Sequence, residues 1–119
     1  MIDRIRLTAA AKIQLSTLKR KTGIEHYNSI CRHALCISLV NPSTPPSEEY
    51  NYSGGVEIDW RTFTGGQEEL YLNLLLLRLH QDGESVTDER IRRACTCHLH
   101  RGLSYLAGKA DDYLAEAIG

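Results

Sequence analysis

The sequence predicts a mainly α-helical protein, folded as a single compact domain over residues 1–119. Apolar residues recur at spacings of three and four over most of the chain, which is the periodicity of helices that pack on a core. The polar–apolar alternation typical of strands is confined to two short segments. A length of 119 residues suffices for one hydrophobic core and is too short for two. We therefore expect about four to five helices with one or two short extended segments.

The N-terminal part is expected to run strand, helix, helix, in the order of a ribbon-helix-helix protein. Residues 3–7 alternate polar and apolar side chains, which predicts a short strand or extended arm. Thr8 is a suitable N-cap for a helix that ends at Gly23, because glycine readily adopts the left-handed backbone of a C-cap. A second helix is predicted over Tyr27–Leu39.

The middle of the chain is predicted to be irregular. All three prolines fall within residues 41–55, which indicates a loop of unusual length for a small domain. Alternation over Val56–Trp60 predicts a second short extended segment. Trp60 and Phe63 are expected at a loop edge, where the tryptophan pins the loop onto the core; stacking on a nucleic-acid base is the alternative.

Two further helices are predicted in the C-terminal half. Gln67–His80 is apolar nearly all round, which is typical of a helix buried in the domain or in an oligomer interface. Asp88–Leu106 carries apolar residues at spacings of three and four, and Ser85 is expected to begin its capping box. A short amphipathic tail is expected after Gly108.

No segment of the sequence suggests export or insertion into a membrane. A charged start followed by a long apolar run, the mark of a signal peptide, is absent. The longest apolar block, Leu74–Leu77, is far too short to span a bilayer. The four cysteines are expected to be free thiols. We therefore expect a cytoplasmic protein.

The charge is distributed unevenly along the chain, although the net charge is only −1. Residues 1–36 carry seven Lys or Arg against two acids, for a net +5. Residues 37–89 carry two Arg against ten acids, for −8, and residues 90–119 carry a net +2. A local basic surface can bind phosphate groups even when the whole molecule is near neutral.

Six cations near the amino end are the candidate DNA-binding residues. Sequence-independent binding requires several positive side chains on one face, which neutralise phosphates. Cations in the last turn of a helix also stabilise the helix dipole, so a solvated helix end is the alternative interpretation. The candidates are Lys19, Arg20, Lys21, Lys12, Arg4 and Arg6.

A run of Cys and His residues in the last predicted helix suggests a metal site by composition but not by spacing. Cys95 and Cys97 are two residues apart, as are His98 and His100. On a helix, residues two apart point about 200° away from each other, so neither pair can bind one ion together. Zinc sites use wider spacings. We expect no metal there, and Cys95 and His98 are predicted core residues.

No motif of a catalytic site is present. Cys31 and Cys36 lie on different faces of the second predicted helix and are interpreted as packing residues, because an activating group is not evident beside them. The glycine pairs lack the pattern of a P-loop or a dinucleotide-binding fingerprint. The acids lack the arrangement for two-metal hydrolysis. We expect a protein without catalytic activity and without a cofactor.

Three stretches of the sequence together resemble the DndE family of DNA sulfur-modification proteins. They are Arg4–Thr8 continuing into Leu18–Ile24, then Asn28–Leu39, and finally His98–Leu106. The middle stretch, with its Cys-Arg-x-Ala-Leu-Cys core, is the most specific. The resemblance extends over nearly the whole chain, and the length and the order of the stretches fit.

The resemblance implies a small, mostly helical homotetramer in the bacterial system that replaces a non-bridging phosphate oxygen of DNA with sulfur. It implies binding to double-stranded DNA with a preference for nicked duplex. The implied partners are a cysteine desulfurase, an adenylyl-sulfate-reductase-like protein and an ATPase. In the family, surface lysines contact the DNA. The resemblance implies the same role here for Lys19 and Lys21, and for Arg20 by position. It extends also to Lys12, Arg4 and Arg6.

Two other classes of function are alternatives. A ribbon-helix-helix transcriptional regulator would read bases in the major groove with its strand. The helices after residue 66 and the lack of an obvious base-reading strand argue against this class. An enzyme would have to use Cys95, Cys97 or a bound metal.

Overall fold

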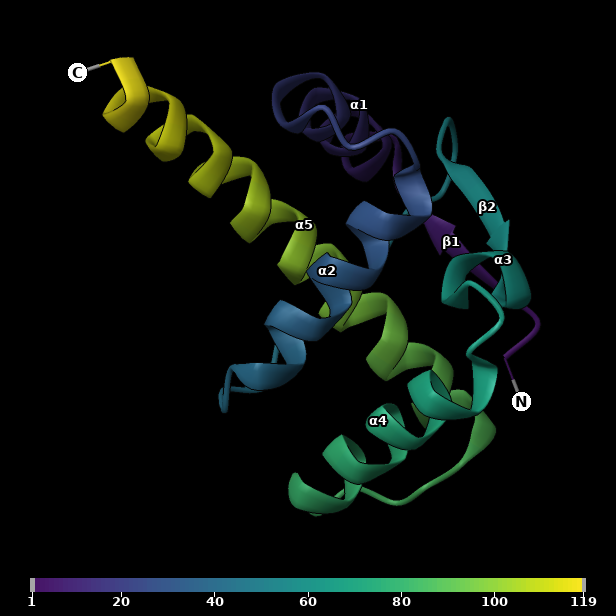
Figure 1. The fold of residues 1–119 in the computed structure, drawn as a ribbon. Coiled ribbons are helices and arrows are strands. Elements are labelled where there is room, and N and C mark those ends of the chain that lie inside the picture. Colours follow the sequence, from purple (N-terminus) through teal and green to yellow (C-terminus); the bar gives the residue numbers. More distant parts are fainter. Residues whose placement is uncertain (1, 119) are drawn as a thin grey trace.

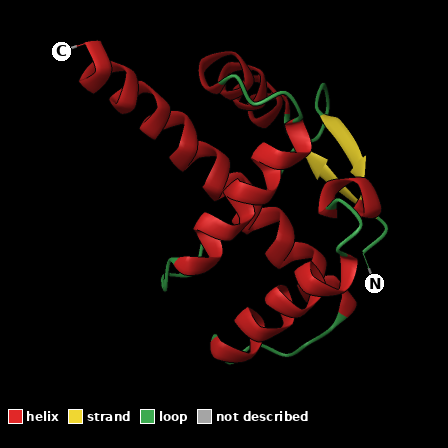
Figure 2. Cartoon of the chain, in the orientation of Figure 1, coloured by secondary structure: helices red, strands yellow, loops and turns green. Residues whose placement is uncertain are grey.

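A computed structural model describes the backbone of residues 2–118 and the side chains of residues 2–109. Within this part of the chain, five helices and one small sheet confirm the predicted mainly helical fold class (Figures 1 and 2). The elements in order are β1 Arg4–Leu7, α1 Ala9–Thr22, α2 Tyr27–Val40, β2 Val56–Asp59, α3 Trp60–Thr64, α4 Glu68–Gln81 and α5 Asp88–Ile118. No helix of the described part is long and apolar enough to cross a membrane.

Helix α5 is the longest helix and the one against which most other elements pack. Helix α2 crosses it near its middle (Figure 1). A Cβ atom added at Gly102 would lie 1.8 Å from the carbonyl oxygen of Ala34, so the two backbones touch. Fully or almost fully buried side chains from both helices surround this contact: Cys31, Ala34, Leu35, Cys95, Leu99 and Leu103. The crossing of α2 and α5 is therefore the centre of the hydrophobic core.

Strands β1 and β2 form an antiparallel two-stranded sheet beside this core. The register pairs Arg4 with Asp59 and Leu7 with Val56. Alternation in β1 buries Ile5 and Leu7 and leaves the arginines exposed, as the sequence predicts. The strand leads directly into α1, whose N-cap Thr8 accepts a hydrogen bond from the backbone N–H of Ala11.

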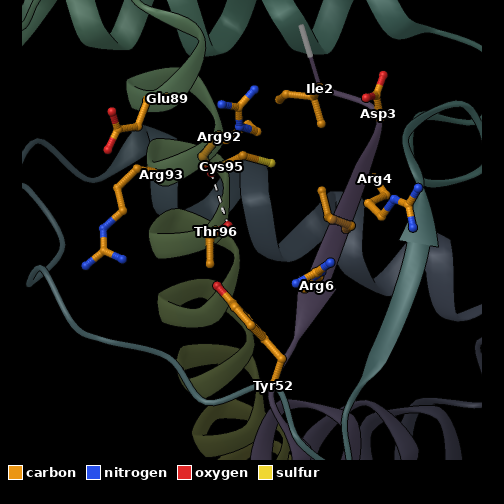
Figure 3. A pocket seen from close by; sticks show the side chains of 11 residues that line it. Ile2, Asp3, Arg4, Arg6, Tyr52, Glu89, Arg92, Arg93, Cys95 and Thr96 are labelled. Carbon is orange, nitrogen blue, oxygen red and sulfur yellow. Dashed lines mark hydrogen bonds between the residues drawn. The ribbon is translucent and has the colours of Figure 1, made fainter.

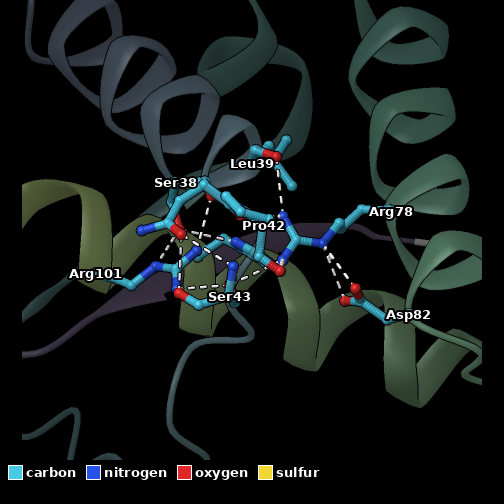
Figure 4. Close-up of polar contacts among 9 residues, drawn as sticks. Ser38, Leu39, Pro42, Ser43, Arg78, Asp82 and Arg101 are labelled. Atoms are coloured by element: carbon cyan, nitrogen blue, oxygen red, sulfur yellow. Dashed lines mark hydrogen bonds and ion pairs between the residues drawn. The ribbon is translucent and has the colours of Figure 1, made fainter.

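Two arginines from other helices satisfy the C-terminal end of α2 (Figure 4). Arg78 of α4 is buried and forms an ion pair with Asp82 one turn later, with its Nε 3.0 Å from a carboxylate oxygen. Its remaining nitrogens donate to four backbone carbonyls, those of Leu39, Asn41, Pro42 and Ser43. Helix C-termini leave unpaired carbonyls, and a buried guanidinium is tolerated only when its charge and donors are satisfied.

Arg101 of α5 completes this arrangement from the other side. It donates to the hydroxyl of Ser38 from Nε, at 2.8 Å, and to the Ser38 carbonyl from Nη2, at 2.8 Å. The Ser38 hydroxyl also forms a hydrogen bond with Nδ1 of His98, 2.8 Å away. Burial and the two nearby guanidinium groups of Arg78 and Arg101 lower the pKa of His98 to about 4. His98 is therefore neutral within the core.

Within a single chain, helix α4 is buried on one face only. Leu75 and Leu79 are buried on one face, together with Arg78. Leu70 and Leu77 are 49% and 54% exposed on the opposite face. Helix α4 therefore has apolar residues both on the face toward the core and on the face toward solvent.

The structure corrects three predicted boundaries. Trp60 and Phe63 lie in the short helix α3 and not in a loop, because the Asp59 side chain accepts from the Thr62 N–H and caps it. The cap of α5 is Thr87, whose hydroxyl accepts from the Arg90 N–H, and not Ser85. Helix α5 continues through Gly108 to Ile118, so the expected separate tail is its last part; the expected apolar face of that tail lies outside the described side chains.

We expect Gly102→Ala to destabilise the protein by about 2–3 kcal/mol, because a methyl group at the α2–α5 contact forces the two backbones apart. Gly108→Ala is the matched control in the same helix, since a Cβ there meets nothing within 4 Å. That change should stabilise by about 0.5–1 kcal/mol through helix propensity. Chemical denaturation measures both, and equal effects of the two substitutions would contradict the close contact.

We expect the free energy of unfolding to fall as the pH drops from about 6.5 to 4. His98 has a folded pKa of about 4, so in this range the unfolded chain binds its proton more readily than the folded chain. His98→Asn keeps an acceptor near Nδ1 and removes the titration. The free energy of unfolding of this variant should fall less steeply as the pH drops. The slopes of the variant and the parent should differ by at most about 1.4 kcal/mol per pH unit. Identical slopes in denaturant titrations at several pH values would rule out His98 as the cause.

Candidate nucleic-acid interface

Arg4 and Arg6 project from the outer face of β1, and both contact one carboxylate. Nη1 of Arg4 lies 3.2 Å from Oε2 of Glu57, and Nε of Arg6 lies 2.8 Å from Oε1 of the same residue. Glu57 stands directly opposite Arg6 in the strand register. The arginine side chains are 59% and 53% exposed, so the two ion pairs are in contact with solvent and are individually weak.

The last turn of α1 places three cations at the C-terminal end of the helix, as the sequence predicts: Lys19, Arg20 and Lys21. Gly23 caps this end with a φ of 74°, a left-handed conformation that favours glycine. The ammonium group of Lys19 lies over the ring of Tyr27, 4.7 Å from its centroid. Positive charge here also interacts favourably with the helix dipole.

The candidate cations on α1 do not all share one face. At 100° per residue, Lys12 and Lys19 lie about 20° apart around the helix axis, and Arg20 lies about 80° from Lys12. Lys21 lies about 180° from Lys12. The helix thus groups Lys12, Lys19 and Arg20 on one side and directs Lys21 elsewhere.

The structure also separates the cations of the strand from those of the helix end. Strand β1 joins α1 at its N-terminus, whereas Lys19 lies ten residues further along the helix. At a rise of 1.5 Å per residue, that distance is about 15 Å. The six candidates therefore form two groups, which we name the strand arginines (Arg4 and Arg6) and the helix-end cations (Lys19, Arg20 and Lys21), with Lys12 between them.

A cavity of about 610 Å³ lies between β1 and the N-terminal half of α5 (Figure 3). The strand arginines line it on one side, and Arg92 and Arg93 of α5 line the other. These two helix residues are not among the six cations that the sequence predicts as DNA contacts. Their position on the polar side of α5 could have indicated that they are surface residues. Only the packing of β1 against α5 shows that they line a cavity with the strand arginines.

Arg93 extends from α5 toward the loop before β2. Its Nη2 donates to the hydroxyl of Ser47, at 3.0 Å, and to the carbonyl of Glu48. Its guanidinium also lies over the ring of Tyr50, 5.8 Å from the centroid. Arg93 therefore anchors the loop before β2 to α5.

The Cys and His residues of α5 belong to the core. Cys95, Cys97, His98 and His100 are all buried. Nε2 of His100 accepts from the Thr8 N–H at 3.2 Å, so its Nδ1 carries the hydrogen that is donated to the Thr96 carbonyl, 2.8 Å away. Among the residues whose side chains are described, no group of three or more His, Cys, Asp or Glu could hold a metal ion.

Three of the four thiols, those of Cys31, Cys36 and Cys95, lack the environment of a nucleophile. Burial raises the pKa of Cys31 and of Cys95 to about 12 each, and it also raises the pKa of Cys36. A thiol with a raised pKa is protonated at neutral pH and reacts poorly. Trp60 and Phe63 are equally unsuited to stacking on a base, because both are buried and their ring centroids lie 5.6 Å apart in contact with each other.

Comparison with known proteins places this fold and sequence in one family. No curated protein sequence matches the chain. Six solved chains resemble it, among them the crystal structure of DndE from Escherichia coli B7A, a protein involved in DNA phosphorothioation modification. That structure superposes with a TM-score of 0.69 at 24% sequence identity and covers 89% of this chain and 99% of its own. The family model for the DNA sulphur modification protein DndE matches residues 4–112, and the protein therefore belongs to the DndE family.

Proposed function

We propose that the protein is a non-catalytic, DNA-binding subunit of the bacterial DNA phosphorothioation system, acting in the cytoplasm. Membership of the DndE family carries this proposal. The structurally similar E. coli protein is involved in the same modification. The proposed DNA-contacting residues are Lys19, Arg20, Lys21, Lys12, Arg4 and Arg6.

The arrangement of the cations supports binding to the DNA backbone. The strand arginines and Arg20 are exposed. Their guanidinium groups can bind phosphates without reading the base sequence. Lys19 lies about 15 Å along α1 from the end of the helix that follows β1, so the strand arginines and the helix-end cations can contact different phosphates of one duplex. Nicked duplex is the preferred substrate in this proposal, since a nick leaves the backbone free to bend between the two contacts.

The proposed partners are further copies of this chain, in a homotetramer, and the enzymes of the modification system. These enzymes are a cysteine desulfurase, an adenylyl-sulfate-reductase-like protein and an ATPase. Exposed apolar side chains on α4, Leu70 and Leu77, support association through that helix. A tetramer would present each basic group four times, and such multivalency raises affinity without new contacts.

A ribbon-helix-helix regulator is the second candidate, because β1, α1 and α2 follow one another in that order. The sheet weakens this candidate. Strand β1 pairs with β2 of the same chain, and its outward arginines contact Glu57. A regulator should bind one DNA sequence far more tightly than others, whereas the phosphorothioation subunit should bind random duplexes of equal length alike.

We expect Lys19→Ala/Arg20→Ala to weaken binding to intact, nicked and random duplexes alike. Each lost phosphate contact should reduce the slope of log Kd against log salt concentration by about 0.9. Fluorescence anisotropy over a range of salt concentrations measures both the affinity and the slope. Arg61→Ala/Arg90→Ala is the control, since it removes two exposed positive charges from α3 and from the start of α5. Equal losses in the two double variants would reject the helix-end cations as the contact surface.

A further inference from the structure

Helix α4 carries an apolar stripe on the face that points away from the core. The stripe contains Leu70 and Leu77, which are 49% and 54% exposed. At 100° per residue the two leucines lie about 20° apart around the helix axis, and both lie roughly 140–160° from the buried Leu75. Figure 1 shows α4 at the edge of the molecule, where another chain can approach this face.

Two polar residues continue the stripe along the helix. Asn73 and His80 are exposed, and positions 70, 73, 77 and 80 follow the alternating spacing of three and four at which paired helices meet. We name these four residues the α4 seam. Glu69 is also exposed, and it lies about 20° from His80 around the axis and roughly 17 Å from it along the axis. The seam therefore has a carboxylate beside its N-terminal end and an imidazole at its C-terminal end.

This order of groups favours an antiparallel pair of identical helices. In a parallel pair each Glu69 would lie beside its own copy, and like charges repel. A two-fold axis between Leu70 and Leu77 instead packs each leucine against the other leucine of the partner subunit. It also brings Glu69 to about 3 Å, along the axis, from the level of the partner's His80. An imidazole has at least one N–H in either protonation state, so it can donate to the carboxylate.

We propose that a second copy of this chain docks on the α4 seam, with the two α4 helices antiparallel around a two-fold axis. The leucine contacts and the Glu69–His80 contact then each occur twice. Asn73 lies near the axis, and a single polar residue within an apolar seam is a known means of specifying register. The inference rests on the association of copies that is part of the proposed function, and it gives that association a surface, an orientation and a symmetry.

Exchange of the two polar groups tests the orientation. Glu69→Lys places a cation beside the partner's His80, and His80→Glu places two acids together, so each single variant should weaken association. We expect a loss of about threefold to thirtyfold in Kd, because each change acts twice across the two-fold axis. Glu69→Lys/His80→Glu restores opposite charges in an antiparallel pair alone, and it should associate at least as tightly as the parent. Sedimentation velocity over a range of protein concentrations measures the Kd of each variant.

Removal of the leucines tests the surface. Leu70→Gln/Leu77→Gln should halve the mass of the assembly at concentrations where the parent is fully associated. Ile13→Gln/Val40→Gln is the matched control, since it replaces two apolar side chains that are 66% and 82% exposed on α1 and α2. The control should keep the parent's mass. Equal losses in the two double variants would show that exposed apolar surface in general, and not the α4 seam, holds the copies together.

The outcomes separate this inference from the proposed function. If the parent associates and all α4 variants associate equally well, the copies meet through another surface, and the α4 pair is rejected while the proposed assembly stands. If the charge exchange fails to recover the loss of its single variants, the antiparallel orientation is rejected. A parent that stays monomeric overturns both the pair and the proposed assembly. Duplex DNA binding by the same samples, measured by fluorescence anisotropy, tests the DNA-binding function independently.

Discussion

The close contact between α2 and α5 is the constraint on which the rest of the structure depends. Only a glycine at position 102 allows the α5 backbone to approach the Ala34 carbonyl, because any side chain would overlap that oxygen. Once the two helices cross there, their buried faces meet around Leu35 and Leu99. Helices α1 and α4 and strand β1 then pack against α5 at different points along its length (Figure 1).

Two arginines, buried Arg78 and partly buried Arg101, connect the core to the long loop. Arg78 and Arg101 reach the end of α2 from two different helices and hold the backbone of residues 38–43 through its carbonyls (Figure 4). These contacts pair backbone carbonyls that the end of α2 leaves without helical partners. His98 forms a hydrogen bond with the Ser38 hydroxyl, and His100 accepts from the backbone N–H of the α1 N-cap Thr8. These two histidines therefore have hydrogen-bonding roles inside the core, next to the buried Cys95 and Leu99.

The packing of β1 and α1 on this core determines where the cations near the amino end lie. Strand β1 presents its arginines beside Glu57 of β2, while Lys19, Arg20 and Lys21 lie at the opposite end of α1 from β1. Cations that are close together in the sequence therefore form two separate groups. The first of these groups acquires its shared ion-pair partner, Glu57, from the neighbouring strand.

Local signals in the sequence determined the helical fold class, the strand at residues 4–7 and the caps of α1, because apolar periodicity, Thr8 and Gly23 act within a few residues. They also placed Cys95 and His98 in the core, since both lie on the apolar stripe of their helix. Tertiary structure alone decided that Arg4 and Arg6 share Glu57, and that Arg78 is buried among carbonyls. The physical reason is that the sequence gives the sign of each charge, but the partners of a charged side chain depend on contacts between segments far apart in the chain.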